Sequence, residues 1–173
     1  MGETGQIDDI REQIFSVPEG LEVYAILDGA SAAQLPQTID QYSIESECLL
    51  RGVLDPDLAQ AAPYLVRPLG DSPFTDWVLR EGWGKHWGIF VVTTANLRAL
   101  RQHFRSFLTV YDPDNVPLFF RYYDPRVLRV YLPTCDAEEL DDVFGPVDRY
   151  LMEGEDGKTL VRCELKDGAL LCR

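Results

Sequence analysis

One stretch in the second half of the chain combines three local signals that constrain the fold. It runs from Leu118 to Leu132 and reads LFFRYYDPRVLRVYL. Its aromatic run has high strand propensity. Asp124 followed by Pro125 is typical of a helix start, because Asp accepts hydrogen bonds from free helical amides and Pro suits the first helical position. Pro133 ends that helix after about two turns. We therefore predict a strand over Phe119–Tyr123 and a helix over Pro125–Leu132, with Asp124 as its N-cap.

The corner between this strand and this helix is a candidate binding site. It gathers Arg121, Tyr123, Asp124 and Arg126. Asp28 also follows a predicted strand, and open sheets place ligands beside strand ends. Two interpretations stay open. In one, Arg121 and Asp124 hold the corner together as a buried ion pair. Removing one partner of such a pair destabilises the fold by more than the intact pair stabilises it. In the other, these side chains contact a partner.

The remaining pattern predicts helices and strands along most of the chain. Helices are expected near residues 8–15, 35–42, 56–62, 73–80, 96–108 and 136–144, and strands near 21–27, 45–51, 64–69, 88–93, 116–123, 147–153, 159–165 and 169–172. Strands that alternate with helices and then give way to hairpins predict a fold between α/β and α+β. We expect a mixed β-sheet with packed helices and a C-terminal antiparallel β-meander. The predicted organisation is a mobile N-terminal lead (1–20), a core domain (21–145) and the short meander (146–173).

The charge balance excludes two classes of partner. The formal net charge is −13, which argues against nucleic acid, whose binding neutralises phosphates with Lys and Arg. It argues equally against docking on anionic lipid. The first ten residues contain no basic and apolar pattern of a signal peptide, and no apolar run is long enough to span a bilayer. We therefore expect a cytoplasmic protein with protein partners.

The cysteines and histidines predict neither a metal site nor a redox site. Cys48, Cys135, Cys163 and Cys172 show no CxxC spacing, and the chain has only two histidines. We expect four free thiols in a reducing compartment, although a disulfide remains the alternative.

Three motif-like segments fail as sites of chemistry. GEDGKT at residues 154–159 lacks the first glycine of a phosphate-binding loop, and a strand follows it where a helix should. Residues 112–115 begin like a calcium loop but lack its later glycine and glutamate. His86 and His103 have no nucleophile elbow to serve, and both are interpreted as structural. We expect no catalytic residue, no metal and no cofactor. The alternative is a small-ligand enzyme that uses the strand-end carboxylates Asp28 and Asp124.

Two further groups have an open interpretation. Arg98, Arg101 and Arg105 share one side of the predicted helix 96–108, opposite its apolar side. They either pair with nearby carboxylates or bind an acidic segment of a partner, in which case charge reversal at Arg101 and Arg105 should weaken binding and leave folding nearly untouched. Trp83 and Trp87 either close one end of the core or form an exposed docking patch.

Four segments resemble one bacterial family. They are YAILDGA (24–30), AAPYLVRPL (61–69), WGIFVVTTANLRALRQHFRSFLTV (87–110) and FRYYDPRVL (120–128). In order and spacing they are similar to the type VI secretion adaptors, or effector chaperones, long catalogued as a domain of unknown function. The resemblance implies an adaptor that holds a secreted toxin effector in the cytoplasm and helps load it onto the spike protein, without a cofactor. It also implies that Arg121, Asp124 and Arg126 carry the family signature. An acidic immunity protein that inhibits a toxin directly is the alternative.

Overall fold

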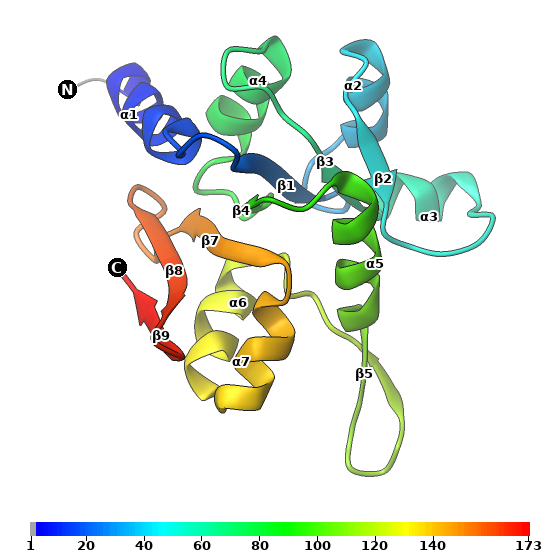
Figure 1. The fold of residues 1–173 in the computed structure, drawn as a ribbon. Coiled ribbons are helices and arrows are strands. Elements are labelled where there is room, and N and C mark those ends of the chain that lie inside the picture. Colours follow the sequence, from blue (N-terminus) through cyan, green and yellow to red (C-terminus); the bar gives the residue numbers. More distant parts are fainter. Residues whose placement is uncertain (1–2) are drawn as a thin grey trace.

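The computed structural model describes residues 3–173 and is built on a seven-stranded sheet (Figure 1). In spatial order the strands are β2 (Ser46–Cys48), β3 (Pro63–Val66), β1 (Glu22–Asp28), β4 (Gly88–Thr93), β7 (Val147–Glu153), β8 (Leu160–Lys166) and β9 (Ala169–Cys172). A separate two-stranded hairpin consists of β5 (Thr109–Tyr111) and β6 (Pro117–Phe119). The predicted α+β class and the C-terminal meander β7–β8–β9 are confirmed.

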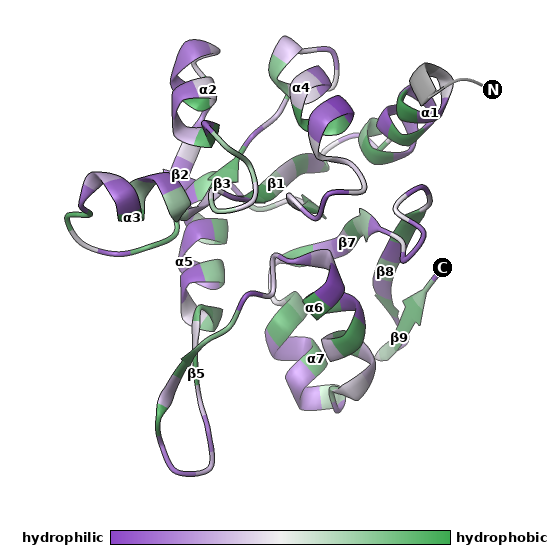
Figure 2. Cartoon of the chain, turned by 180° about the vertical axis from the view of Figure 1, so that it is seen from behind, coloured by the Kyte–Doolittle hydropathy of each residue, from purple (hydrophilic) through white to green (hydrophobic). Residues whose placement is uncertain are grey.

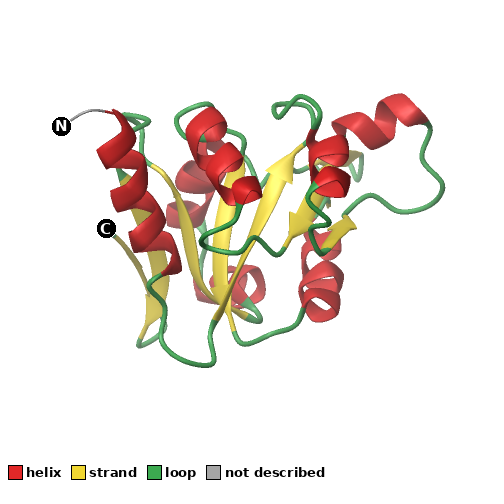
Figure 3. Cartoon of the chain, turned by 90° about the horizontal axis from the view of Figure 1, so that it is seen from above, coloured by secondary structure: helices red, strands yellow, loops and turns green. Residues whose placement is uncertain are grey.

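Helices cover both faces of the sheet (Figures 1 and 3). They are α1 (Glu3–Phe15), α2 (Leu35–Gln41), α3 (Pro56–Ala61), α4 (Pro73–Gly82), α5 (Leu97–Phe107), α6 (Pro125–Tyr131) and α7 (Ala137–Phe144), with a 3-10 turn η1 (Leu132–Thr134) after α6. Side chains of α1, α2 and α4 form one buried cluster with the sheet, and those of α5, α6 and α7 form the other.

Strand β1 lies between these two clusters. Tyr24 and Ile26 face the α5–α7 cluster, and Val23, Ala25 and Leu27 face the other one, because successive side chains of a strand point to opposite faces. This double burial explains the nearly continuous apolar run of the strand. In Figure 2 hydrophobic colour is concentrated on the strands and on parts of the helices.

The sheet differs from the prediction in strand direction. All neighbouring strands pair antiparallel, whereas alternating strands and helices favour parallel pairs. A parallel pair needs a long crossover connection, usually through a helix that runs back along the sheet. The helical connections do join strands of the same direction, β1 to β2 through α2 and β3 to β4 through α4, but in each case an antiparallel strand lies between the two. Adjacent strands of the sheet therefore form no parallel pair.

The predicted strand over Phe119–Tyr123 is wrong. Strand β6 ends at Phe119, and the chain then turns, with the Asp124 amide donating to the Arg121 carbonyl at 3.0 Å. The turn buries Tyr122, whose hydroxyl donates to the Phe104 carbonyl of α5 at 2.9 Å. Aromatic propensity for strands was therefore overridden by packing against α5. The helix that follows is confirmed, and Asp124 is its N-cap, since its side chain accepts from the Arg126 amide at 3.0 Å.

The prediction of four free thiols is also wrong. Cys163 and Cys172 form a disulfide, and Cys48 and Cys135 are the free cysteines of the described chain. The cause is the register of the last hairpin. Cys163 on β8 lies directly opposite Cys172 on β9, with their Cα atoms 4.2 Å apart. Sequence spacing alone gives no indication of such cross-strand pairing.

The two predicted end segments both contact the main body. Ile10 and Ile14 of α1 are 3% and 0% exposed and belong to the core cluster of that face. Strand β7 pairs along β4, so the sheet continues through the predicted boundary at residue 146.

Among residues 3–173, no helix is long and apolar enough to cross a membrane.

Candidate functional site

Five predicted site residues come together where β1 ends and α6 begins. Asp28 closes β1, and Arg121, 93 residues later, donates to its Oδ2 atom from Nη2 at 2.7 Å. The same Arg121 nitrogen lies 3.8 Å from Oδ2 of Asp124, and Arg126 binds Asp124 in turn. We refer to Asp28, Arg121, Asp124 and Arg126 as the Asp–Arg corner.

Asp28 is a buried acceptor with several donors. Its side chain is 1% exposed. Besides Arg121, Oδ1 accepts from the Ala30 amide at 3.0 Å and Oδ2 from the Ser31 hydroxyl at 2.8 Å. The next residue must be glycine, because a Cβ at Gly29 would lie 2.3 Å from the Gln60 carbonyl oxygen. The Asp-Gly pair therefore fixes a tight exit from β1 with its carboxylate turned inward.

Asp124 is held by the first turn of its own helix. Arg126 donates to it from Nε at 3.0 Å and from Nη2 at 2.7 Å, a bidentate contact. Burial alone would raise the pKa of the Asp124 carboxyl, but the side-chain and main-chain hydrogen bonds from Arg126 outweigh it and the pKa is lowered. Asp124 is therefore ionised at neutral pH.

Tyr123 forms the apolar floor of the corner. It is 2% exposed, and burial raises the pKa of its hydroxyl to about 12. The guanidinium carbon of Arg121 lies 6.0 Å from the centre of its ring, at the outer limit of a cation–π contact. The carboxylates are buried, whereas the side chains of Arg121 and Arg126 are 43% and 55% exposed. The corner therefore presents arginine side chains to solvent and hides the acids that orient them.

A second polar cluster lies at the same end of the sheet. Glu153, the last residue of β7, is 3% exposed. Its Oε2 accepts from the Gly84 amide at 2.6 Å, and its Oε1 contacts Nδ1 of His86. Arg129 of α6 donates to the main-chain oxygen of Glu153. This cluster ties the loop before β4 and helix α6 to the end of β7.

Sequence reasoning missed Glu153 and Arg129 as parts of this end of the structure. Glu153 is the last residue of a predicted strand, and an acid at a strand end is usually solvated. The one sequence feature that pointed to this cluster was His86 in a glycine-rich loop, but it did not indicate which residue His86 would contact.

The sequence model of a family described as a domain of unknown function (DUF4123) matches residues 23–142. The chain belongs to this family. All four residues of the Asp–Arg corner lie inside the DUF4123 match, whereas Glu153 and the disulfide lie beyond it. No curated protein matches the chain, and no solved structure matches it.

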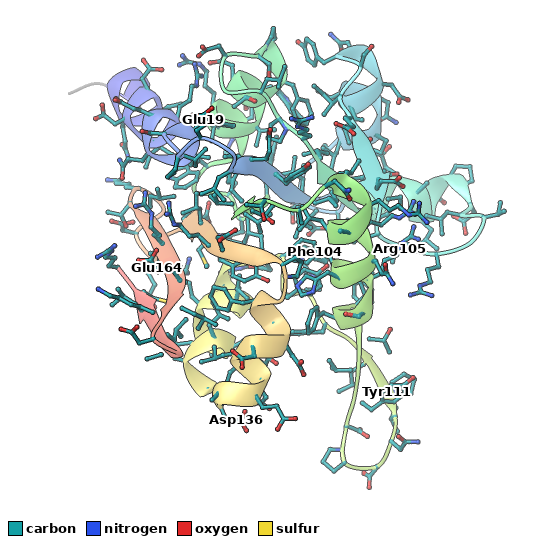
Figure 4. The ribbon with its side chains drawn as sticks, viewed as in Figure 1. Glu19, Phe104, Arg105, Tyr111, Asp136 and Glu164 are labelled. Carbon is teal, nitrogen blue, oxygen red and sulfur yellow. A yellow bond between two sulfur atoms is a disulfide. The ribbon has the colours of Figure 1, made fainter. Side chains whose placement is uncertain are left out.

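We refer to Arg98, Arg101 and Arg105 of α5 as the basic stripe, and part of it contacts β2 and the residues that follow β2. Arg101 pairs with Glu47 at 2.8 Å. Arg105 donates from Nη2 to the main-chain oxygens of Cys48 and Leu50, at 2.8 and 3.3 Å. Arg98 is exposed and pairs with no carboxylate in the described part of the chain. Figure 4 shows Arg105 on the side of α5 toward β2 and α3. The structure therefore changes the expectation that charge reversal at Arg105 leaves folding untouched.

The remaining candidates occupy structural positions. Trp83 and Trp87 are half-buried and pack on the α1–α2–α4 cluster, as the core interpretation predicts. Nε2 of His103 hydrogen-bonds the Val143 carbonyl at 3.0 Å. Asp112 organises a turn, and its Oδ1 accepts from the Asp114 and Val116 amides. Among the described residues, no three His, Cys, Asp or Glu side chains form a group that could hold a metal.

Proposed function

We propose that this chain is a type VI secretion adaptor that binds a toxin effector in the cytoplasm and assists its loading onto the spike protein. The observation that carries the proposal is the Asp–Arg corner. It unites two of the four segments that resemble the adaptor family, YAILDGA through Asp28 and FRYYDPRVL through Arg121, Asp124 and Arg126. The proposal includes no catalytic step, no metal and no cofactor, and its partners include neither nucleic acid nor membrane.

The arrangement of charges in the corner supports binding better than chemistry. A general base needs a free lone pair near the proton that it abstracts. Asp28 and Asp124 each accept three hydrogen bonds from protein donors. The exposed guanidinium groups, in contrast, are held in place by these buried acids. Donors that are already oriented lose little conformational entropy when a partner's carboxylate or carbonyl binds.

The proposal predicts that genes for a toxin and for a spike protein lie beside the gene of this chain, and the test is a binding experiment with their purified products. We expect a stable complex with the toxin and a ternary complex with the spike. Arg126→Gln should weaken toxin binding about tenfold, since one charged hydrogen bond at an interface is worth roughly 1.4 kcal/mol or more.

Arg173→Gln is the matched control. The side chain of Arg173 is 65% exposed and pairs with Glu164 at 3.0 Å, far along the chain from the corner. The Arg173→Gln variant should bind toxin as the wild type does. Absence of any complex between wild-type chain and toxin would overturn the proposal. A complex in which the toxin loses its activity would assign the chain to the immunity proteins instead, because an adaptor leaves its cargo active.

A further inference from the structure

The β5–β6 hairpin projects from the body of the protein as an arm. Its strands pair only with each other, and neither joins the seven-stranded sheet. In Figure 1 it extends beyond the end of α5, and Figure 4 shows Tyr111 on it, remote from the core. We refer to residues 109–119 as the hairpin arm.

The arm is unusually apolar for an exposed segment. Among the described residues, five of the ten large hydrophobic side chains that are exposed lie in it. They are Val110 (38% exposed), Tyr111 (64%), Val116 (49%), Leu118 (48%) and Phe119 (53%). Figure 2 shows hydrophobic colour on the hairpin away from the body. Exposed apolar side chains gathered on one segment indicate an interaction site.

Both faces of the arm carry this surface. Val110 lies opposite Leu118 in the register and shares its face. Tyr111 and Phe119, one residue further along each strand, point to the other face. A hairpin with one apolar face would suit a flat surface. Two apolar faces favour insertion into a cleft that covers both.

The arm is ordered before any partner binds. At the tip, Oδ1 of Asp112 accepts from the Asp114 amide at 2.9 Å and from the Val116 amide at 2.8 Å. Asn115 adopts a left-handed conformation, with φ of 61°. At the base, the Phe120 amide donates to the Leu108 carbonyl at 3.0 Å. A preformed hairpin reduces the entropy that binding must otherwise cost.

Charge indicates which kind of surface covers the arm. Residues 106–120 contain Asp112 and Asp114 and no Lys, Arg or His. The whole chain carries −13, so a second copy would bring two acidic surfaces together. A cleft with basic residues near the tip is complementary to both features.

We propose that the hairpin arm is a second contact of the chain with the toxin effector, in addition to the Asp–Arg corner, and that it inserts into an apolar cleft of the cargo whose rim carries Lys or Arg. This inference rests on the proposed adaptor function. Tyr111 and Phe119 supply the aromatic anchors, since aromatic residues dominate the binding energy of interfaces. Asp112 and Asp114 face the basic rim.

The experiment titrates the purified neighbouring toxin against wild type and the double variant Tyr111→Ser/Phe119→Ser. Binding should weaken at least ~30-fold, the effect of losing two aromatic anchors. The control is Val53→Ser/Leu69→Ser, which removes two hydrophobic side chains that are 104% and 63% exposed elsewhere. The control should bind as the wild type does. Both variants should melt within a few degrees of wild type, because all four side chains are exposed.

Asp114→Lys tests the charge of the proposed cleft. It should weaken toxin binding several-fold at low salt and less at high salt, because exposed charges are screened. Asp148→Lys, at an exposed site on β7, is its control. Equal affinities of Asp114→Lys and wild type would remove the basic rim from the proposal.

Photo-crosslinking identifies what contacts the arm. A benzophenone amino acid at position 111 should crosslink to the toxin, whereas one at the exposed Glu19 should not. Crosslinks between two copies of the chain instead would make the arm a dimer contact and overturn the inference.

The outcomes separate this inference from the proposed function. If wild type does not bind the toxin, both fail. If wild type binds and the Tyr111→Ser/Phe119→Ser variant binds equally well, the adaptor function stands and the docking role of the arm is refuted.

Discussion

At the residue scale, the carboxylate of Asp28 has two roles. It caps the turn after β1 through Ala30 and Ser31, and it binds Arg121, which lies 93 residues further along the chain. A buried charge is tolerated only when such partners replace water. Asp28 therefore couples the local turn to the position of α6.

We predict that Asp28→Ala destabilises the fold by about 2–4 kcal/mol. The variant loses a charged hydrogen bond worth roughly 1.5–3 kcal/mol and leaves the Ala30 amide without an acceptor. The partial exposure of Arg121 keeps the loss below that of a fully buried pair. Urea unfolding followed by circular dichroism gives the measurement. Asp148→Ala, at an exposed position, should stay within ~0.5 kcal/mol of wild type; an equal effect of the two substitutions would contradict the buried role of Asp28.

His103 gives the molecule a predicted pH dependence near neutrality. Burial lowers the pKa of its imidazole below 6.5, and the hydrogen bond to the Val143 carbonyl only partly offsets this. The unfolded chain therefore binds a proton at this residue at a higher pH than the folded chain does. Stability is retained above about pH 6.5 and falls as the pH is lowered through the folded pKa.

The expected result is that His103→Gln reduces the loss of stability between pH 7.5 and pH 5. Glutamine keeps a donor for the Val143 carbonyl but does not titrate. Unfolding free energies of both proteins at several pH values provide the comparison, since every other residue is common to both. Parallel curves would show that His103 is not the source.

At the scale of elements, α5 places one part of its surface against the core, one against β2 and one toward solvent. Leu100 and Phe104 are 0% exposed and belong to the α5–α7 core cluster, and Tyr122 stacks on Phe104 with ring centres 5.7 Å apart. Arg105 donates to the Cys48 carbonyl of β2, a strand of three residues. Arg98 remains exposed at the start of the same stripe. Arg105, at one end of the stripe, therefore holds β2 against α5, whereas Arg98, at the other end, is exposed to solvent.

The stripe yields a matched pair of predictions. Arg105→Glu should lower the unfolding free energy by about 1.5–3 kcal/mol, because a charged donor to the carbonyls of Cys48 and Leu50 is replaced by a charge that repels them. Arg98→Glu should change it by no more than ~0.5 kcal/mol. Thermal melting of the two variants checks both values. Equal melting temperatures would mean that the contacts to Cys48 and Leu50 do not hold β2 in place.

At the scale of the whole molecule, one sheet contains strands from both halves of the chain. Strand β7 covers the exposed side of β4, and β8 and β9 extend the sheet, with the Cys163–Cys172 disulfide closing the last hairpin. Tyr150 and Met152 of β7 belong to the same core cluster as Phe104 and Leu128. The meander, which lies beyond the DUF4123 match, therefore supplies part of the same core as the matched residues.

We predict that a chain ending at Gly145 does not fold cooperatively. It would lose β7 and expose the edge of β4 together with the buried side chains that Tyr150 and Met152 cover. Calorimetry should show one transition for the full chain, because its parts share one sheet, and none for the shortened chain. A shortened chain with a sharp transition would show instead that the predicted boundary near residue 145 separates an independent unit.

The sequence alone predicted the local elements and the residues of the site, because these depend on short-range chemistry. The Asp-Pro start of α6, the buried run of β1 and the apolar spacing of α5 are each encoded within about a dozen residues, and the structure contains all three. The family resemblance likewise indicated Arg121, Asp124 and Arg126 as candidates, and the position of Asp28 after a predicted strand indicated Asp28.

Only the tertiary structure decided how these parts meet. Asp28 and Arg121 are 93 residues apart, and no local pattern specifies their 2.7 Å contact. The same holds for the antiparallel strand order, for the pairing of Cys163 with Cys172 and for the contact between Glu153 and His86. The aromatic residues after Phe119 do not form a strand, although their strand propensity is high. The burial of Tyr122 and Tyr123 against α5 and the corner outweighs that preference, which is worth at most about 1 kcal/mol. Long-range packing determined these features, since burial and charge pairing depend on residues that only the folded chain brings together.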